Sequence, residues 1–96
     1  MKVRWTEASA RRIEEIRDFV ARDDPSAASR LAAELVALGE SLRALPLRGR
    51  RVPELPDPAL RELILRNYRL VYRVRGSAVE VLTVFEAHRL IPTEDL

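Results

Sequence analysis

The sequence predicts an α+β fold in which a helical hairpin packs on one face of a small antiparallel sheet. Two amphipathic helical patterns follow one another in the first half of the chain, and two alternating patterns typical of strands lie in the second half. The chain has 96 residues, of which 47% are hydrophobic. A chain of this size is expected to form one domain, residues 1–96, around one core.

A short strand and a first helix are predicted at the start of the chain. Residues 2–5 include Val3 and Trp5 and read as a strand that stops before Thr6. Because a threonine hydroxyl accepts hydrogen bonds from the free amides of a helix start, a helix is expected to begin here. Hydrophobic residues then recur at spacings of three and four, which predicts an amphipathic helix. They are Ala10, Ile13, Ile16, Phe19 and Val20.

A second helix is predicted to begin at Asp24-Pro25, where aspartate caps the free amides and proline suits the first helical position. Its hydrophobic stripe continues for about five turns until Pro46. The stripe consists of Ala28, Leu31, Leu35, Leu38, Leu42 and Leu45. It fits either the inner face of a helical hairpin or the seam of a dimer, and the short length favours the hairpin.

A long surface connection follows the second helix. Pro46, Gly49, Pro53, Pro56 and Pro58 rule out a regular helix here and disfavour a central strand. Residues 60–66 are ambiguous, whereas residues 68–75 and 78–85 alternate cleanly as strands on either side of a tight turn at residues 76–77. The predicted order is therefore β-α-α-β-β-β.

Two helices cover only one face of such a sheet, so the other face is expected to stay partly open. If Tyr68 and Leu70 point at the helices, then Arg69, Arg73 and Arg75 point to the open face.

Charge and composition narrow the classes of function. The net charge is only +2, but residues 46–75 hold eight arginines against three acids, a local charge of +5 that suits an acidic partner. Cysteine is absent and His88 is the only histidine, so neither a metal site nor a cofactor is expected. No segment reads as an export signal or a membrane span, and a cytoplasmic protein is expected.

The segment Asn67-Tyr68-Arg69-Leu70-Val71-Tyr72-Arg73-Val74, together with the order of elements, resembles the RelE/ParE superfamily of type II toxins. The resemblance covers nearly the whole chain and also includes Gly49-Arg50, Arg61 and His88-Arg89. It implies a toxin that is neutralised by a cognate antitoxin. ParE-like members inhibit DNA gyrase by binding, whereas RelE-like members are ribosome-dependent mRNA endoribonucleases, and the fold alone does not choose between them.

In the ribonuclease interpretation, Arg61, Arg69 and Arg89 would hold phosphate and His88 would transfer protons. This set is incomplete, since Leu63 stands close to a position where RelE has a lysine and no tyrosine follows Tyr72. The resemblance is therefore closer to ParE, and a binding toxin is favoured over an enzyme.

The arginines are assigned to partner or target binding, with no metal ligand among them. The expected partner is an antitoxin with a small acidic toxin-binding segment in a hetero-oligomer, and DNA gyrase is the expected target, with the ribosome and mRNA as the alternative. The assigned residues are Arg50, Arg61, Arg69, Arg73, Arg75 and Arg89.

Overall fold

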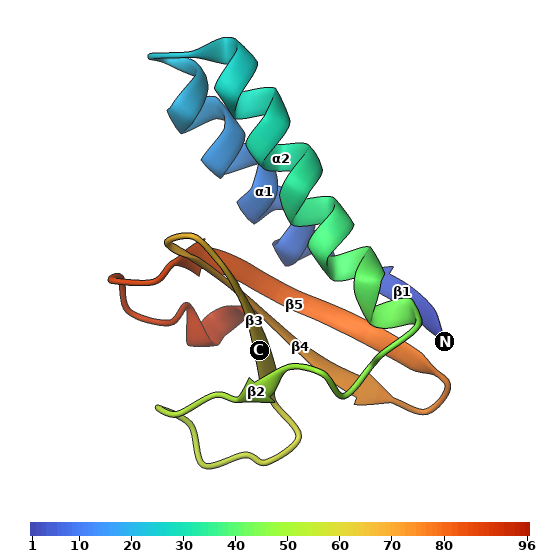
Figure 1. Ribbon diagram of the computed structural model, residues 1–96. Coiled ribbons are helices and arrows are strands. Elements are labelled where there is room, and N and C mark those ends of the chain that lie inside the picture. The colour runs from blue at the N-terminus through green and yellow to red at the C-terminus, as the bar shows by residue number, and fades with distance from the viewer.

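Both helices begin at the capping residues that the sequence indicates. In the computed structural model, which describes residues 1–96, α1 spans Glu7–Ala21 and α2 spans Pro25–Glu40. The Thr6 hydroxyl accepts a hydrogen bond from the Ser9 amide at 3.1 Å, and the Asp24 carboxylate accepts one from the Ala27 amide at 3.0 Å. The helices lie side by side as a hairpin on one face of the sheet (Figure 1). Neither is long and apolar enough to cross a membrane.

The second helix is shorter than its hydrophobic stripe predicted. After Glu40 the chain tightens into the 3-10 turn Ser41–Arg43, where the Ser41 hydroxyl donates to the Leu38 carbonyl at 2.6 Å. This turn still carries Leu42 into the core with no exposed surface, but Leu45 lies beyond it and is 61% exposed. The expectation that Leu45 continues the hydrophobic stripe of the helix is therefore wrong, because the helix ends before it.

The sheet is mixed and has five strands in the order β1-β5-β4-β3-β2. β1 is parallel to β5, and every other neighbouring pair is antiparallel. The predicted α+β fold and order of elements are confirmed, with β2 as an additional short edge strand, but the expectation of a purely antiparallel sheet is wrong because β1 runs parallel to β5. The helical hairpin, rather than a tight turn, connects β1 to the rest of the sheet, so its parallel direction has no local sequence signal. The strands are β1 Lys2–Trp5, β2 Arg50–Arg51, β3 Arg61–Leu65, β4 Tyr68–Arg75 and β5 Ala78–Glu86.

A β-bulge changes which side chains of β5 face the helices. Val71 pairs with Thr83 and Tyr72 pairs with Val81, which leaves Leu82 as an extra residue. Val79, Val81 and Val84 consequently pack toward the helices, although strict alternation would have placed Val84 on the opposite face. Beyond the bulge, the β4–β5 turn has Gly76 at φ 60°, a left-handed conformation that favours glycine.

The larger core lies between the helical hairpin and the sheet. α2 and β1 approach closely there, since a Cβ on Gly39 would clash with the Trp5 ring. The Trp5 indole N–H donates to the Glu40 carboxylate at 2.9 Å. We call this the helix-side core. Its buried members are Ile13, Leu31, Leu35, Leu42, Leu63, Tyr68, Leu70, Tyr72, Val79, Val81 and Val84.

A second, smaller core covers the middle of the opposite sheet face, where an open surface was expected. The proline-containing loop contributes Val52, which is 2% exposed, and the C-terminal residues Ile91 and Leu96 pack against the same cluster. The predicted surface connection is therefore partly buried, whereas Arg75, near the β4–β5 turn, remains exposed. We call this second cluster the tail-side core. It contains Val52, Leu60, Val71, Leu82 and Phe85.

Candidate functional site

Arg69 lies in a buried ion-pair cluster beside the tail-side core. The residue is only 6% exposed, although arginine is rarely buried unless it is paired. Its Nε donates to Glu62 Oε1 at 2.7 Å, and its two terminal nitrogens donate to the Glu54 carboxylate at 2.6 and 2.7 Å. The guanidinium also lies over the Phe85 ring, 5.1 Å from the ring centroid. Arg69 is thus held by groups of its own chain.

Glu62 is the buried acid of this cluster and is 1% exposed. Its second oxygen accepts a hydrogen bond at 2.7 Å from Nε of Arg50, whose side chain is 60% exposed. The hydrogen bonds to Glu54 raise the pKa of Arg69 well above its ordinary value, and the same bonds lower the pKa of Glu54. Two arginines and two carboxylates therefore balance one another, which offsets the cost of burying charge.

The expectation that Arg69 stands free on an open sheet face is wrong. Its side chain does point away from the helices, but the loop that carries Glu54 closes over it. Sequence reasoning missed Glu54 and Glu62 as its partners. A signal was present, because Glu62 is the only acid in a strand of otherwise mostly apolar residues, and a buried carboxylate needs a cation.

Arg61 holds the loop that follows α2. Its Nη1 donates to the Gly49 carbonyl at 2.8 Å and to the Leu47 carbonyl at 3.3 Å. The Tyr72 hydroxyl accepts a hydrogen bond from the Gly49 amide at 2.9 Å. Gly49 has no room for a side chain, since a Cβ would lie 2.7 Å from the Glu62 carbonyl oxygen. These contacts place Arg50 beside Glu62.

Arg73 and Arg75 lie at the other end of β4, near the turn to β5. Arg73 Nε donates to Glu80 Oε1 at 3.0 Å, and Arg75 Nη1 lies 3.9 Å from the same oxygen. The side chain of Arg75 is 67% exposed. Arg75 lies seven positions along β4 from Tyr68, which pairs with Glu86 at the end of β5, a distance of about 23 Å at the usual rise. Arg73 and Arg75 therefore lie on a different part of the surface from His88 and Arg89, which follow Glu86.

His88 and Arg89 gather around Glu86 at the end of β5. His88 Nε2 lies 3.5 Å from Glu86 Oε2, and Arg89 Nε lies 3.4 Å from Glu86 Oε1. Glu86 pairs with Tyr68, whereas Arg61 pairs with Tyr72 four residues along the same strand, about 13 Å away. The four residues proposed for RNA cleavage are thus not brought together. No group of three His, Asp or Glu side chains is arranged to hold a metal ion.

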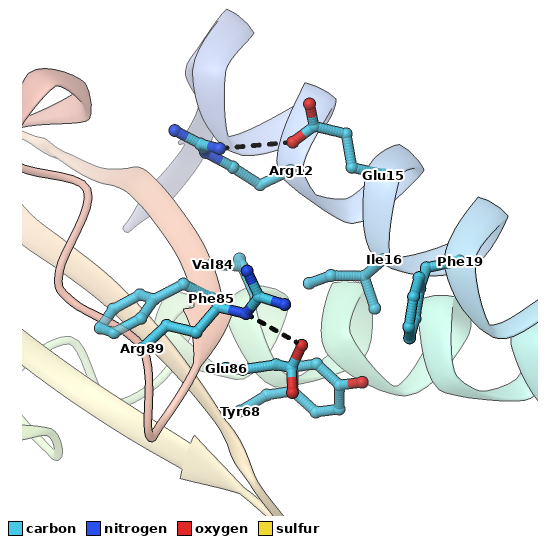
Figure 2. A pocket seen from close by; sticks show the side chains of 9 residues that line it. All are labelled: Arg12, Glu15, Ile16, Phe19, Tyr68, Val84, Phe85, Glu86 and Arg89. Atoms are coloured by element: carbon cyan, nitrogen blue, oxygen red, sulfur yellow. Dashed lines mark hydrogen bonds and ion pairs between the residues drawn. The ribbon is translucent and has the colours of Figure 1, made fainter.

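A pocket of about 220 Å³ lies between α1 and the adjoining ends of β4 and β5 (Figure 2). Figure 2 shows Arg12 and Glu15 on the helix side, and Tyr68 and the Arg89–Glu86 ion pair on the sheet side. Burial, together with the Glu86 charge, raises the pKa of the Tyr68 phenol. Five of its nine lining residues are hydrophobic, and its four charged residues form two ion pairs, Arg12 with Glu15 and Arg89 with Glu86. Its lining is Arg12, Glu15, Ile16, Phe19, Tyr68, Val84, Phe85, Glu86 and Arg89.

A salt bridge fastens the end of the chain to α1. The Asp95 side chain is 3% exposed and accepts hydrogen bonds from Arg12 Nε at 2.7 Å and the Thr83 hydroxyl at 2.8 Å. Burial by itself raises the pKa of Asp95, but the bonds from Arg12 and Thr83 outweigh it and leave the pKa lower than usual. This contact was not predicted, because 83 residues separate Asp95 from Arg12.

We expect Asp95→Asn to destabilise the protein by about 1–3 kcal/mol at neutral pH, since it replaces a charged hydrogen-bond acceptor by a neutral one. A carboxylate with a lowered folded-state pKa contributes stability that is fully present above the unfolded-state value and is lost as pH falls through the folded-state value. The loss in wild type should therefore occur below the ordinary aspartate value of 3.8. Urea unfolding between neutral pH and about pH 2 measures it. A difference between wild type and variant that stays constant down to pH 2 would contradict this assignment.

Comparison with known proteins places the chain in a family. The model of the family described as "ParE toxin of type II toxin-antitoxin system, parDE" matches residues 3–91. The chain belongs to the ParE toxin family. This membership confirms the resemblance noted in the sequence and makes the protein a toxin of a type II toxin-antitoxin system.

Individual relatives of this ParE-family toxin agree with the family match. The chain is 36% identical over 95 residues to the putative toxin Y4kP of Sinorhizobium fredii, covering 95% of this chain and 93% of the relative. It is 33% identical over 90 residues to toxin RelE2 of Caulobacter vibrioides, covering 93% and 98%. A solved structure of the chromosomal ParDE system from P. aeruginosa has the same fold, with a TM-score of 0.78 at 23% identity over 92% of this chain and 97% of that one.

Proposed function

We propose that this toxin inhibits DNA gyrase by binding it in the cytoplasm, and that a cognate antitoxin with a small acidic segment neutralises the toxin. The ParE family match supports the class of target. Arg69 favours binding over RNA cleavage, because its side chain is buried and its guanidinium is already paired with Glu54 and Glu62 instead of being free to hold a phosphate. RNA cleavage requires a base, an acid and cations around a single phosphate.

Antitoxin binding is supported by the surface of the helical hairpin. A groove of about 520 Å³ runs between the outer sides of α1 and α2, and most of its lining is small and apolar. Such a groove suits a segment that folds on binding. Its lining is Ile13, Arg17, Ser29, Ala32, Ala33, Val36 and Ala37.

Exposed arginines supply the charge complementarity for an acidic antitoxin segment or target. Arg50 and Arg89 keep 60% and 67% of their side-chain surface exposed, so both remain assigned to protein partners. Arg61 and Arg69 are engaged within the fold, and their proposed contribution is to position the loop that carries Arg50. The toxin and antitoxin are expected to form a hetero-oligomer.

The direct experiment adds purified toxin to DNA gyrase with supercoiled plasmid and ATP, and measures cleaved gyrase–DNA complexes. Heat-denatured toxin is the control for non-specific protein effects. Toxin saturated with the antitoxin from the neighbouring gene tests whether that antitoxin neutralises the toxin. We expect cleaved complexes with folded toxin alone. If folded toxin produces no more cleaved DNA than the denatured control, gyrase is not the target.

The second candidate function is ribosome-dependent cleavage of mRNA, and the contact of His88 with Glu86 beside Arg89 favours it. In that case His88→Ala should abolish growth inhibition while antitoxin affinity stays nearly unchanged, because the His88 side chain is 70% exposed and outside the core. Ser77→Ala, at another exposed position, is the control for expression and handling. Full toxicity of His88→Ala would eliminate this mechanism and leave the gyrase proposal untouched.

A further inference from the structure

The sheet places four cations together on its face opposite the helices, at the end next to the β4–β5 turn, where Lys2, Arg4 and Arg75 are exposed. Val3 and Trp5 of β1 pack against the helix-side core, so Lys2 and Arg4 point to the opposite face. Two rows then cross three neighbouring strands. One row is Arg4, Glu80 and Arg73, and the other is Lys2, Ala78 and Arg75. We call Lys2, Arg4, Arg73 and Arg75 the turn-end patch.

This patch carries an excess of positive charge. Glu80 is the only carboxylate in the two rows, and it is already shared between Arg73 at 3.0 Å and Arg75 at 3.9 Å. Lys2 and Arg4 are exposed and form no ion pair within the chain. Four cations against one carboxylate leave a net charge of +3 on rigid neighbouring strands. A fixed field of one sign attracts a polyanion.

The dimensions of the patch suit a row of phosphates. Strands lie about 4.8 Å apart, so β1 and β4, on either side of β5, are separated by about 10 Å. Residues two apart on one strand are separated by about 7 Å, which sets the distance between the rows. B-DNA carries one phosphate charge per about 1.7 Å of helix axis, and an area of this size therefore faces several phosphates.

The chemistry of the patch favours a nucleic acid over a protein. Protein interfaces are anchored by buried aromatic or large apolar side chains, and the two rows contain none, since Ala78 is their only apolar residue. Arginine and lysine side chains are the usual ligands of backbone phosphates and carry no sequence information. We infer that the turn-end patch binds the phosphate backbone of a nucleic acid without sequence preference. This activity goes beyond the proposed inhibition of gyrase and does not depend on it.

Fluorescence anisotropy of the full chain with a labelled mixed-sequence DNA duplex tests the inference. Four phosphate contacts predict a slope of about −3.6 in the logarithm of the binding constant against the logarithm of salt concentration. The triple variant Lys2→Gln, Arg4→Gln and Arg75→Gln should reduce this slope by about three and weaken binding about tenfold or more at low salt. All three side chains are exposed, so the fold should persist, and circular dichroism checks it.

The matched control removes the same charge elsewhere, through Arg11→Gln, Arg22→Gln and Arg30→Gln at exposed positions of the helical hairpin. We expect this variant to keep the slope of the wild type. Equal losses in both variants, or no binding by the wild type at low salt, would overturn the inference.

Two further arms identify the ligand. If backbone phosphate is the ligand, binding of a single-stranded RNA of mixed sequence should be weakened by the same triple variant. Tighter binding of RNA than of DNA would support the same site and identify RNA as the preferred nucleic acid. Polyglutamate at equal charge should displace the labelled duplex poorly. Displacement as effective as that by unlabelled duplex would show a site for acidic protein and would overturn the assignment to nucleic acid.

Discussion

Replacing Arg69 by methionine is expected to lower the free energy of unfolding by about 3–5 kcal/mol, the range for removing one partner of a buried ion pair. Methionine fills much of the volume of the arginine stem but leaves Glu62, whose side chain has no exposed surface, with Arg50 as its only cation. Urea unfolding followed by circular dichroism measures the change.

Arg75→Met is the matched control for this prediction, since it is the same substitution on the same strand at a side chain that is 67% exposed. It should change stability by no more than about 0.5 kcal/mol. The double variant Arg69→Met with Glu62→Leu should recover much of the loss, because a buried ion pair replaced by apolar groups is often neutral. An Arg69→Met variant as stable as the Arg75→Met control would show that Glu62 does not depend on Arg69.

Leu35→Ala is expected to destabilise the protein by about 2–5 kcal/mol, the usual cost of truncating a fully buried leucine. Leu35 has no exposed surface and lies in the helix-side core between α2 and the sheet. Val36→Ala is the matched control, because Val36 follows directly on the same helix and is 42% exposed. Its effect should stay within about 0.5 kcal/mol.

The Leu35 experiment also tests the two interpretations of the leucine stripe. In an intramolecular hairpin, the free energy of unfolding does not depend on protein concentration, and neither does the loss caused by Leu35→Ala. In a dimer seam, the unfolding midpoint rises with protein concentration, because association stabilises the folded state. A concentration-dependent midpoint in wild type that disappears in Leu35→Ala would contradict the position of Leu35 in the structure.

The interpretation of the arginines changes once their partners are known. The sequence predicts one group of six arginines available to a partner, but the fold separates them. Arg69 is a buried structural residue, Arg61 holds a loop, and Arg50 and Arg89 are mostly exposed. Arg73 and Arg75 join two residues of β1 that the sequence places about seventy positions away. The solvent exposure and the ion-pair partners of each arginine, rather than its residue type, therefore decide which arginines are available to bind a partner.

Elements whose signals are local follow from the sequence alone. Thr6 and Asp24 cap helices through amides three residues further along, and the β4–β5 hairpin follows from alternation around a tight turn with glycine in a left-handed conformation. Each of these interactions lies within a few residues, so one stretch of sequence contains all of its causes. The same holds for the segments that carry the resemblance to the ParE family.

Features that depend on which strands and loops become neighbours emerge only when the whole chain folds. The parallel pairing of β1 with β5, the bulge at Leu82 and the contact of Asp95 with Arg12 have no local signal. The burial of Arg69 depends on a loop fifteen residues away in sequence that folds over it. The local sequence around an arginine in an alternating strand is the same whether its side chain is exposed to solvent or paired with a buried carboxylate. Its burial therefore depends on how the whole chain folds.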